Sequence, residues 1–270
     1  MTLAAAVIET EALEPQTIIA IGEGTEAWIP PLTRCAPSGL APVDLDRLGT
    51  SAASSALRDG VVRFKIRLAN TEGVRSSASY LIEKMYGWRG YSVSPVAENR
   101  RPITIVASDR ERALATISIG FDSREKLLAD ALYGPELDRL RAGGARLCEF
   151  TRLAVDRTEQ SREVLAMMFH IAYMYARRFA RCTDLLIEVN PRHVRFYRAM
   201  LGFEVLGEER TCARVDAPAV LLRLDLGYCE RQIARFGGRR ELATAVRSLY
   251  PLAFSRREED GICGRLRELG

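Results

Sequence analysis

The sequence predicts an α/β protein, in the α+β sense of a mixed central sheet with helices on its faces. Two features of residues 61–225 predict this class. Short segments rich in Val, Ile and Leu, which are typical of strands, recur along the region. Amphipathic segments with helical spacing separate them, and no internal repeat is visible. The predicted order is strand, helix, antiparallel strands, strand, long helix, strand, short helix, strand, strand.

The first strand is predicted over Val61–Leu68, where apolar residues alternate with polar ones. A helix follows over Val74–Trp88. Ile103–Ala107 and Ala115–Ile119 are predicted as strands, joined by a hairpin turn over the charged segment Ser108–Arg112.

Two short helices are predicted next, Arg124–Leu132 and Glu136–Ala142, and Gly143-Gly144 ends the second. Arg146–Val155 is expected to be a strand. Ser161–Arg181 follows as one long amphipathic helix, because its apolar residues recur with a period close to 3.6.

Asp184–Val189 is an almost continuous apolar run, as in a buried strand. Asn190 begins a helix that has Pro191 at its first position, and Gly202 ends it. The final strands are predicted at Phe203–Leu206 and Ala219–Asp225.

Three regions are expected along the chain. Residues 1–55 are rich in Ala, Pro, Ser and Gly, which favours a partly irregular N-terminal extension with a short strand at Thr17–Ile21. Residues 56–230 form the main domain. Residues 231–270 have a helical but charged pattern and are expected to pack on that domain as a C-terminal extension.

The composition favours a cytoplasmic protein without a transmembrane segment. No apolar run approaches the ~20 residues that a membrane-spanning helix needs. Glu9 and Glu11 occur early and no basic region precedes them, which argues against a signal peptide. The six cysteines form no close pair, so free thiols in a reducing compartment are expected. With only two histidines, a histidine-rich metal site is excluded, and no bound cofactor is expected.

The charge of the chain argues against a nucleic-acid-binding protein. The formal net charge is +4, and basic residues are mixed with 35 acidic ones, so the chain lacks the basic surface of a nucleic-acid-binding protein. Only three of its 39 basic residues are lysine. This bias either reflects composition alone or supplies forked donors for carboxylates and phosphates.

The segment VNPRHVRFYRAMLGFEVLG, residues 189–207, resembles the last motif of the GNAT (N-acetyltransferase-type) superfamily. The match consists of three features: an Asn after a buried strand, then a short helix that contains Phe-Tyr, then the sequence Gly-Phe-Glu. The residues that carry it are Asn190, Phe196, Tyr197, Gly202, Phe203 and Glu204. The resemblance implies a GNAT-like acyl-CoA N-acyltransferase fold.

The segment LCEFTRLAVD, residues 147–156, lies where that superfamily has its acyl-donor strand. It is also similar to the Glu-x-x-Arg strand of acyl-homoserine lactone synthases, which share the fold. Together with DSREKLLADALYGPELDRLRAGGARL, residues 122–147, it resembles the long-chain N-acyl amino acid synthases of the FeeM type. The resemblance covers roughly residues 60–226. It implies transfer of a long fatty acyl group from acyl carrier protein to an amino acid amine, with tyrosine as a possible acceptor.

The turn after the donor strand bears on the acyl donor. Residues 156–162, DRTEQSR, lack the glycine that GNAT enzymes carry in their pyrophosphate loop. A helix N-terminus still binds anions, but close backbone approach to a pyrophosphate is harder without glycine. A carrier-protein phosphopantetheine has no pyrophosphate. The turn therefore favours acyl-phosphopantetheine on a carrier protein over acyl-CoA as co-substrate.

Attack of an amine on a thioester needs a base and donors for the developing oxyanion. Glu149 is the candidate base. Strand alternation places Thr151 on its face and Arg152 on the other, unless a β-bulge, typical of GNAT donor strands, changes these directions. Arg152 is a candidate clamp for the acceptor carboxylate, and Thr151 a candidate substrate contact. Alternatively, Glu149 and Arg152 form an ion pair that only ties the sheet together.

The remaining donor contacts follow from the resemblance. It places pantetheine along Leu153 and Val155 and the phosphate near Arg157 and Arg162. Asn190 either hydrogen-bonds pantetheine or caps the following helix.

The helix after Asn190 carries two further candidates. Tyr197 lies where many GNAT enzymes place a general acid, and a core anchor is the alternative. Arg192, Arg195 and Arg198 recur at helical spacing and form either a docking surface for an acidic carrier protein or a solvated face. His193 is expected at the surface.

A long acyl chain also needs an apolar tunnel. Its candidate lining, or else ordinary core, is Met167, Met168, Phe169, Tyr173, Met174 and Tyr175 on the long helix. Trp88 and Tyr91 lie where lactone synthases and their relatives have an acceptor-side lid. YLIEKMYGWRGY, residues 80–91, lacks the arginine-rich pattern of the lactone synthases, which puts S-adenosylmethionine recognition in doubt.

Other functions remain open at this stage. One is an acyl-homoserine lactone synthase-like or acyl-CoA-dependent GNAT N-acyltransferase. Another is a non-catalytic GNAT-like module that binds a lipid or a partner, in which Arg152 would neutralise Glu149 and no open cleft would reach it.

Overall fold

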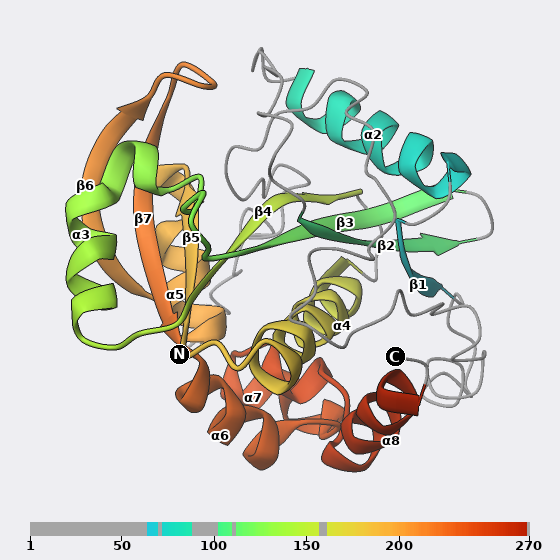
Figure 1. Ribbon diagram of the computed structural model, residues 1–270. Helices are drawn as coiled ribbons and strands as arrows, with labels where there is room; N and C mark the ends of the chain where they lie inside the picture. The colour runs from blue at the N-terminus through green and yellow to red at the C-terminus, as the bar shows by residue number, and fades with distance from the viewer. Residues whose placement is uncertain (1–63, 70–71, 88–101, 110–111, 157–160, 269–270) are drawn as a thin grey trace, which may run out of the picture.

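The computed structural model describes residues 64–69, 72–87, 102–109, 112–156 and 161–268. Within them a seven-stranded mixed sheet has the order β1-β2-β3-β4-β5-β7-β6 (Figure 1). The strands are β1 Lys65–Leu68, β2 Ile103–Asp109, β3 Arg112–Phe121, β4 Leu147–Val155, β5 Asp184–Val189, β6 Glu204–Cys212 and β7 Ala217–Asp225. All described neighbours are antiparallel except β4 and β5, which run parallel. The predicted mixed sheet is therefore confirmed.

Helices cover both faces of this sheet, as Figure 1 shows. On one face, α2 (Glu72–Gly87) lies over β3 and β4, and α3 (Asp130–Ala142) lies beside β6. On the other face, α4 (Ser161–Tyr173) packs against β2 and β3. The main apolar core lies between the sheet and α4.

The helix predicted over Arg124–Leu132 is wrong. The chain forms turns up to Ala129, and α3 begins at Asp130. Side chains take the amides that a helix would use: Asp130 accepts from the Leu127 N–H at 2.8 Å, and Glu149 accepts from the next two. The two short predicted helices are replaced by one helix with a kink at Tyr133, two residues before Pro135, which lacks an amide hydrogen.

Two further elements differ in extent. The predicted long helix is α-helical as far as Tyr173 and then continues as a π-helix, η3, over Met174–Phe179. Strand β6 runs to Cys212, well beyond the predicted Phe203–Leu206, because this edge strand exposes many polar side chains and so shows no clear apolar alternation. The hairpin strands β2 and β3 extend into the predicted turn, of which residues 110–111 lie outside the described residues.

The short helix after β5 matches the prediction. It begins as a 3-10 turn, η4 (Pro191–His193), continues as α5 (Val194–Leu201) and ends at Gly202. Gly202 has φ +81°, the left-handed conformation that glycine adopts without strain. A β-carbon there would also lie 2.5 Å from the Tyr228 ring, so the glycine serves close packing as well.

The C-terminal segment is helical and packs on the core beneath α4 (Figure 1). It comprises α6 (Leu226–Phe236), the short α7 (Ala243–Val246) and α8 (Arg256–Glu268). The Tyr250 hydroxyl donates to the Leu201 carbonyl at 2.7 Å, and the Phe254 N–H donates to His170 Nδ1 at 3.1 Å. In the described ranges, no helix combines the length and apolar character needed to cross a membrane.

Candidate active site

The donor strand β4 carries a β-bulge. Ser118 of β3 pairs with Thr151, but Thr116 pairs with Ala154, so two residues of β4 lie opposite the single residue Ile117. Arg152, at the bulge, has φ +51°, an unusual conformation for a residue with a side chain.

The bulge shifts the side-chain alternation of β4. Before it, Leu147 packs with the α3 cluster on one face. After it, Leu153 and Val155 pack into the core under α4, and Ala154 packs with α2. The expectation of simple alternation through Arg152 is therefore wrong, and the alternative with a bulge is confirmed.

The parallel pairing of β4 and β5 is short. Only Leu147–Glu149 pair with Asp184–Leu186, and both strands then continue with other partners. Figure 1 shows the two strands separating beyond this point. Glu149 is therefore the last residue of β4 that pairs with β5.

Glu149 is buried, with 5% of its surface exposed. Its carboxylate accepts the Leu128 N–H at 2.8 Å and the Ala129 N–H at 3.1 Å, just before α3 begins. These amides, and not Arg152, hold the carboxylate in the described residues. The helix N-terminus favours the charged form, whereas burial disfavours it.

Burial dominates the balance and raises the pKa of Glu149 to about 7. The two amides oppose this rise, and the charge of Glu188 adds to it. A carboxyl group with a pKa near 7 is suited to exchange protons at neutral pH.

A second buried carboxylate, Glu188, lies on the same sheet face, two residues after Leu186. Arg214 donates one Nη to Glu188 and the other to the Leu128 carbonyl at 2.8 Å. Leu128 thus links both carboxylates: its amide hydrogen binds Glu149 and its carbonyl binds the arginine that pairs with Glu188.

Small hydroxyl residues continue this polar surface across the sheet. Thr104 and Ser118 share a hydrogen bond of 2.8 Å, and Ser118 pairs in register with Thr151. Thr116, one pair further along, is fully buried and its hydroxyl has no hydrogen-bond partner in the described residues. Thr151 is therefore part of a buried polar row that ends beside Glu149.

The predicted pantetheine contacts are distributed as follows. Leu153 and Val155 are buried on the α4 face. Asn190 caps the following helix by accepting the Arg192 N–H at 3.3 Å, which confirms the capping alternative. Arg162 is half-buried near the start of α4. Arg157, like the possible lid residues Trp88 and Tyr91, lies outside the described residues.

Tyr197 lies in the core with 0% exposure. Its ring packs against Phe169, Phe196 and Phe203, with centroid separations between 5.2 and 6.4 Å. These contacts are those of a core anchor, the alternative to a general acid.

The three arginines of the predicted docking surface are exposed, and Arg195 and Arg198 line a shallow hollow with Pro191 and Phe203. His193 is not at the surface as expected. It is buried with 6% exposure and accepts a hydrogen bond from Arg192 Nε at 3.1 Å. The 3-10 turn before α5 directs it inward, which helical spacing alone did not indicate.

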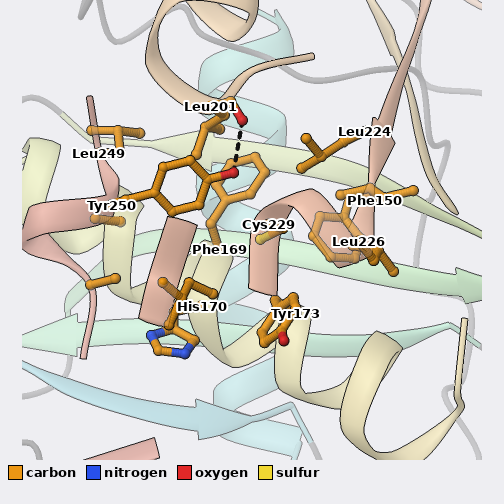
Figure 2. Close-up of a pocket in the computed structure, with 14 residues that line it drawn as sticks. Phe150, Phe169, His170, Tyr173, Leu201, Leu224, Leu226, Cys229, Leu249 and Tyr250 are labelled. Atoms are coloured by element: carbon orange, nitrogen blue, oxygen red, sulfur yellow. Dashed lines mark hydrogen bonds between the residues drawn. The ribbon is translucent and has the colours of Figure 1, made fainter. Parts of the chain in front are cut away.

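An apolar pocket lies on the opposite face of the sheet from Glu149, because Phe150, the next residue of β4, lines it. Figure 2 shows the residues that surround this pocket. The sheet contributes Phe150, the residue after Glu149, and the long helix contributes Phe169 and Tyr173. The C-terminal segment closes it with Leu226, Cys229, Ile233, Leu249, Tyr250 and Ala253. Of the six predicted tunnel residues, only Phe169 and Tyr173 line this pocket.

Several residues of the site were missed by sequence reasoning. Gly120 pairs with Glu149 across β3 and β4 and leaves room for its side chain. Glu188 looked like part of a buried strand, although a charge inside an apolar run was a usable signal. Arg214 lies in the turn between β6 and β7, where the local sequence gives no indication of its partner.

A mixed sheet with one parallel pair, a bulged donor strand and a buried glutamate at the end of that pair defines a GNAT-like acyltransferase. The family model described as "N-acyl amino acid synthase FeeM" matches residues 77–225, more than half of the chain. The chain therefore belongs to the FeeM family of N-acyl amino acid synthases.

Solved structures resemble this chain to different extents. FeeM, an N-acyl amino acid synthase from uncultured soil microbes, is 26% identical with a TM-score of 0.58, over 63% of this chain and 93% of that chain. The AHL synthase LasI is 13% identical with a TM-score of 0.47, over 62% and 91%. An N-acetyltransferase from Staphylococcus aureus Mu50 is 16% identical with a TM-score of 0.42, over 60% and 97%. No curated protein matched the sequence.

Proposed function

We propose that this acyltransferase moves a long-chain acyl group from acyl carrier protein to the α-amine of an amino acid, with an aromatic acceptor such as tyrosine. One arrangement carries the proposal. Glu149 lies on one face of the sheet where β4 and β5 separate, and an apolar pocket lies on the other face below Phe150.

The thioester carbonyl belongs at this separation, with the amine beside Glu149 and the acyl tail directed into the apolar core below Phe150. The pocket there has a volume of about 20 Å³, so its lining must move apart to admit a long chain. Nitrogen attacks the carbonyl carbon, Glu149 accepts the proton, and the C–S bond breaks to release the pantetheine thiol. A pKa near 7 allows Glu149 to accept that proton and then return it to the leaving thiolate. The bulge at Arg152 gives the backbone a means to aim an amide at the developing oxyanion.

Carrier protein is the proposed donor for two reasons. The turn at residues 156–162 lacks glycine, which disfavours a pyrophosphate, and exposed arginines on η4 and α5 suit an acidic partner. The cytoplasm, where carrier proteins reside, is the proposed location. Arg152 and Thr151 are the proposed contacts to the acceptor carboxylate.

The deciding experiment supplies purified protein with acyl carrier proteins and acyl-CoAs of C8 to C18, with each amino acid in turn, and identifies products by mass spectrometry. We expect acylated amino acids with the carrier protein at much higher kcat/KM than with coenzyme A. Equal or better use of acyl-CoA would overturn the donor assignment. Absence of any acylated amine with a folded protein would overturn the function.

The Glu149→Gln variant tests the base. It should lower turnover at least 100-fold while the protein remains folded by circular dichroism. Unchanged turnover would remove Glu149 from this role.

A further inference from the structure

Within the described residues, one carboxylate oxygen of Glu188 has no hydrogen-bond partner. The residue is buried, with 3% exposure, and its Oε2 accepts a hydrogen bond from Arg214. Its Oε1 is buried and has no hydrogen-bond partner in the described part of the chain. Arg214 does not serve both oxygens: its other Nη donates to the Leu128 carbonyl, and its buried Nε makes no hydrogen bond within the described residues.

The position of Glu188 places this oxygen near the proposed base. Leu186 is the β5 residue opposite Glu149, and Glu188 follows it on the same face, where β5 no longer pairs with β4. The two carboxylates are close enough for the charge of Glu188 to affect the protonation of Glu149.

A buried carboxylate oxygen without a donor is costly in an apolar interior, and such a group in a native protein calls for an explanation, such as a catalytic role or a bound water or ion. An amine or ammonium N–H supplies the missing donor and makes a strong charge-assisted hydrogen bond. Under the proposed function, the amine of the acceptor is such a group, and it lies on this face of the sheet beside Glu149.

We propose that Glu188 binds the α-amine of the acceptor amino acid, with Oε1 accepting one N–H while Glu149 takes the proton that is transferred. The inference rests on the proposed function. When nitrogen attacks the thioester carbon, a C–N bond forms and the nitrogen becomes positive. Glu188 stabilises this positive charge, Glu149 removes one proton, the C–S bond then breaks, and Glu149 returns the proton to the leaving thiolate. Charge and protons balance without a further reactant.

A purely structural role is the competing interpretation. Arg214 lies in the turn between β6 and β7, so its pair with Glu188 could serve only to fix that turn against β5. Glu136 offers a matched control, because it is also a buried glutamate paired with an arginine of the same region, Arg210. Unlike Glu188, Glu136 receives donors on both oxygens.

The test compares Glu188→Gln with Glu136→Gln. For Glu188→Gln we expect kcat/KM for the acceptor to fall 10- to 100-fold through KM, with KM for the acyl donor unchanged. Glu136→Gln should lower the midpoint of thermal unfolding but leave KM for the acceptor unchanged. Acceptor kinetics within twofold of wild type in Glu188→Gln, or equal losses in the two variants, would overturn the inference.

A binding experiment separates this inference from the proposed function. Calorimetry compares L-tyrosine with 3-(4-hydroxyphenyl)propanoic acid, which lacks the amine. The wild type should bind tyrosine more tightly, and Glu188→Gln should lose that preference. If no turnover is found but the preference depends on Glu188, the function fails and the amine site stands. Equal binding of the two compounds by the wild type, or binding of neither, overturns the site.

Discussion

Gly120 and Glu149 face each other across β3 and β4, and a β-carbon on Gly120 would lie 3.0 Å from Glu149 Cγ and 3.1 Å from its Oε1. The glycine is thus required by the position of a neighbouring side chain, and its own φ is not in the left-handed region. The space next to the proposed base exists only because this residue has no side chain.

Gly120→Ala should therefore displace the Glu149 carboxylate from the Leu128 and Ala129 amides. We expect turnover to fall about tenfold and the free energy of unfolding to fall by about 1–3 kcal/mol, the usual range for overpacking. Steady-state kinetics and urea unfolding measure both. Gly264→Ala is the control, because a β-carbon there meets nothing within 4 Å and should leave turnover unchanged. Full activity of Gly120→Ala would refute the close fit.

The pKa of Glu149, raised by burial to about 7, predicts the acid limb of the pH profile. Only the deprotonated carboxylate acts as base, so kcat/KM, expressed per unprotonated acceptor amine, should fall tenfold per pH unit below about 7. A limb with a midpoint near 4.5, the ordinary value for glutamate, would contradict the raised pKa.

The raised pKa of Glu149 also makes the stability of the fold depend on pH. The folded state binds this proton more tightly than the unfolded chain, so the contribution of Glu149 to stability decreases as pH rises from about 4.5 to about 7. Glu149→Gln should flatten the pH dependence of the unfolding free energy in that window. The measurement is chemical denaturation at several pH values, and an unchanged slope would argue against the shift.

The apolar pocket predicts control of acyl-chain length by the C-terminal segment. Leu249→Ala removes lining and should shift product chains toward greater length, and Ala253→Leu fills the pocket and should shift them shorter. Leu249→Ala should also cost about 2–5 kcal/mol of stability. Leu252→Ala is the control, since Leu252 is buried in the same segment but does not line the pocket. The measurement is the distribution of acyl-chain lengths among the products when the enzyme receives a mixture of acyl carrier proteins with different chains. Identical distributions in all variants would show that the acyl tail does not bind in this pocket.

Replacement of Arg192, Arg195 and Arg198 by Gln should raise KM for acyl carrier protein about tenfold and weaken its dependence on salt. KM for the amino acid should not change. The matched control replaces Arg231, Arg235 and Arg239, which are also exposed but lie in or just after α6. Similar losses from both sets would indicate a general charge effect instead of a docking surface.

Much of the fold followed from local sequence. Strands β3, β4, β5 and β7 and the Pro191–Gly202 helix show strong apolar periods or clear helix start and stop residues. The failures occurred where a distant group decided local structure. Residues 124–129 have helical spacing, yet Asp130 and Glu149 take their amides. Strand β6 lacks a pattern because its edge position leaves it polar.

The sequence by itself determined the order of elements, the donor strand and the choice of Glu149, because periodicity and motif spacing are local properties of the chain. The tertiary structure alone decided what surrounds Glu149. Gly120 lies in β3, Leu128 in the turn before α3 and Glu188 in β5. Only the assembly of the sheet and this turn brings the three residues around Glu149. The burial that raises the pKa of Glu149 is likewise a property of the assembled core, which no single segment encodes.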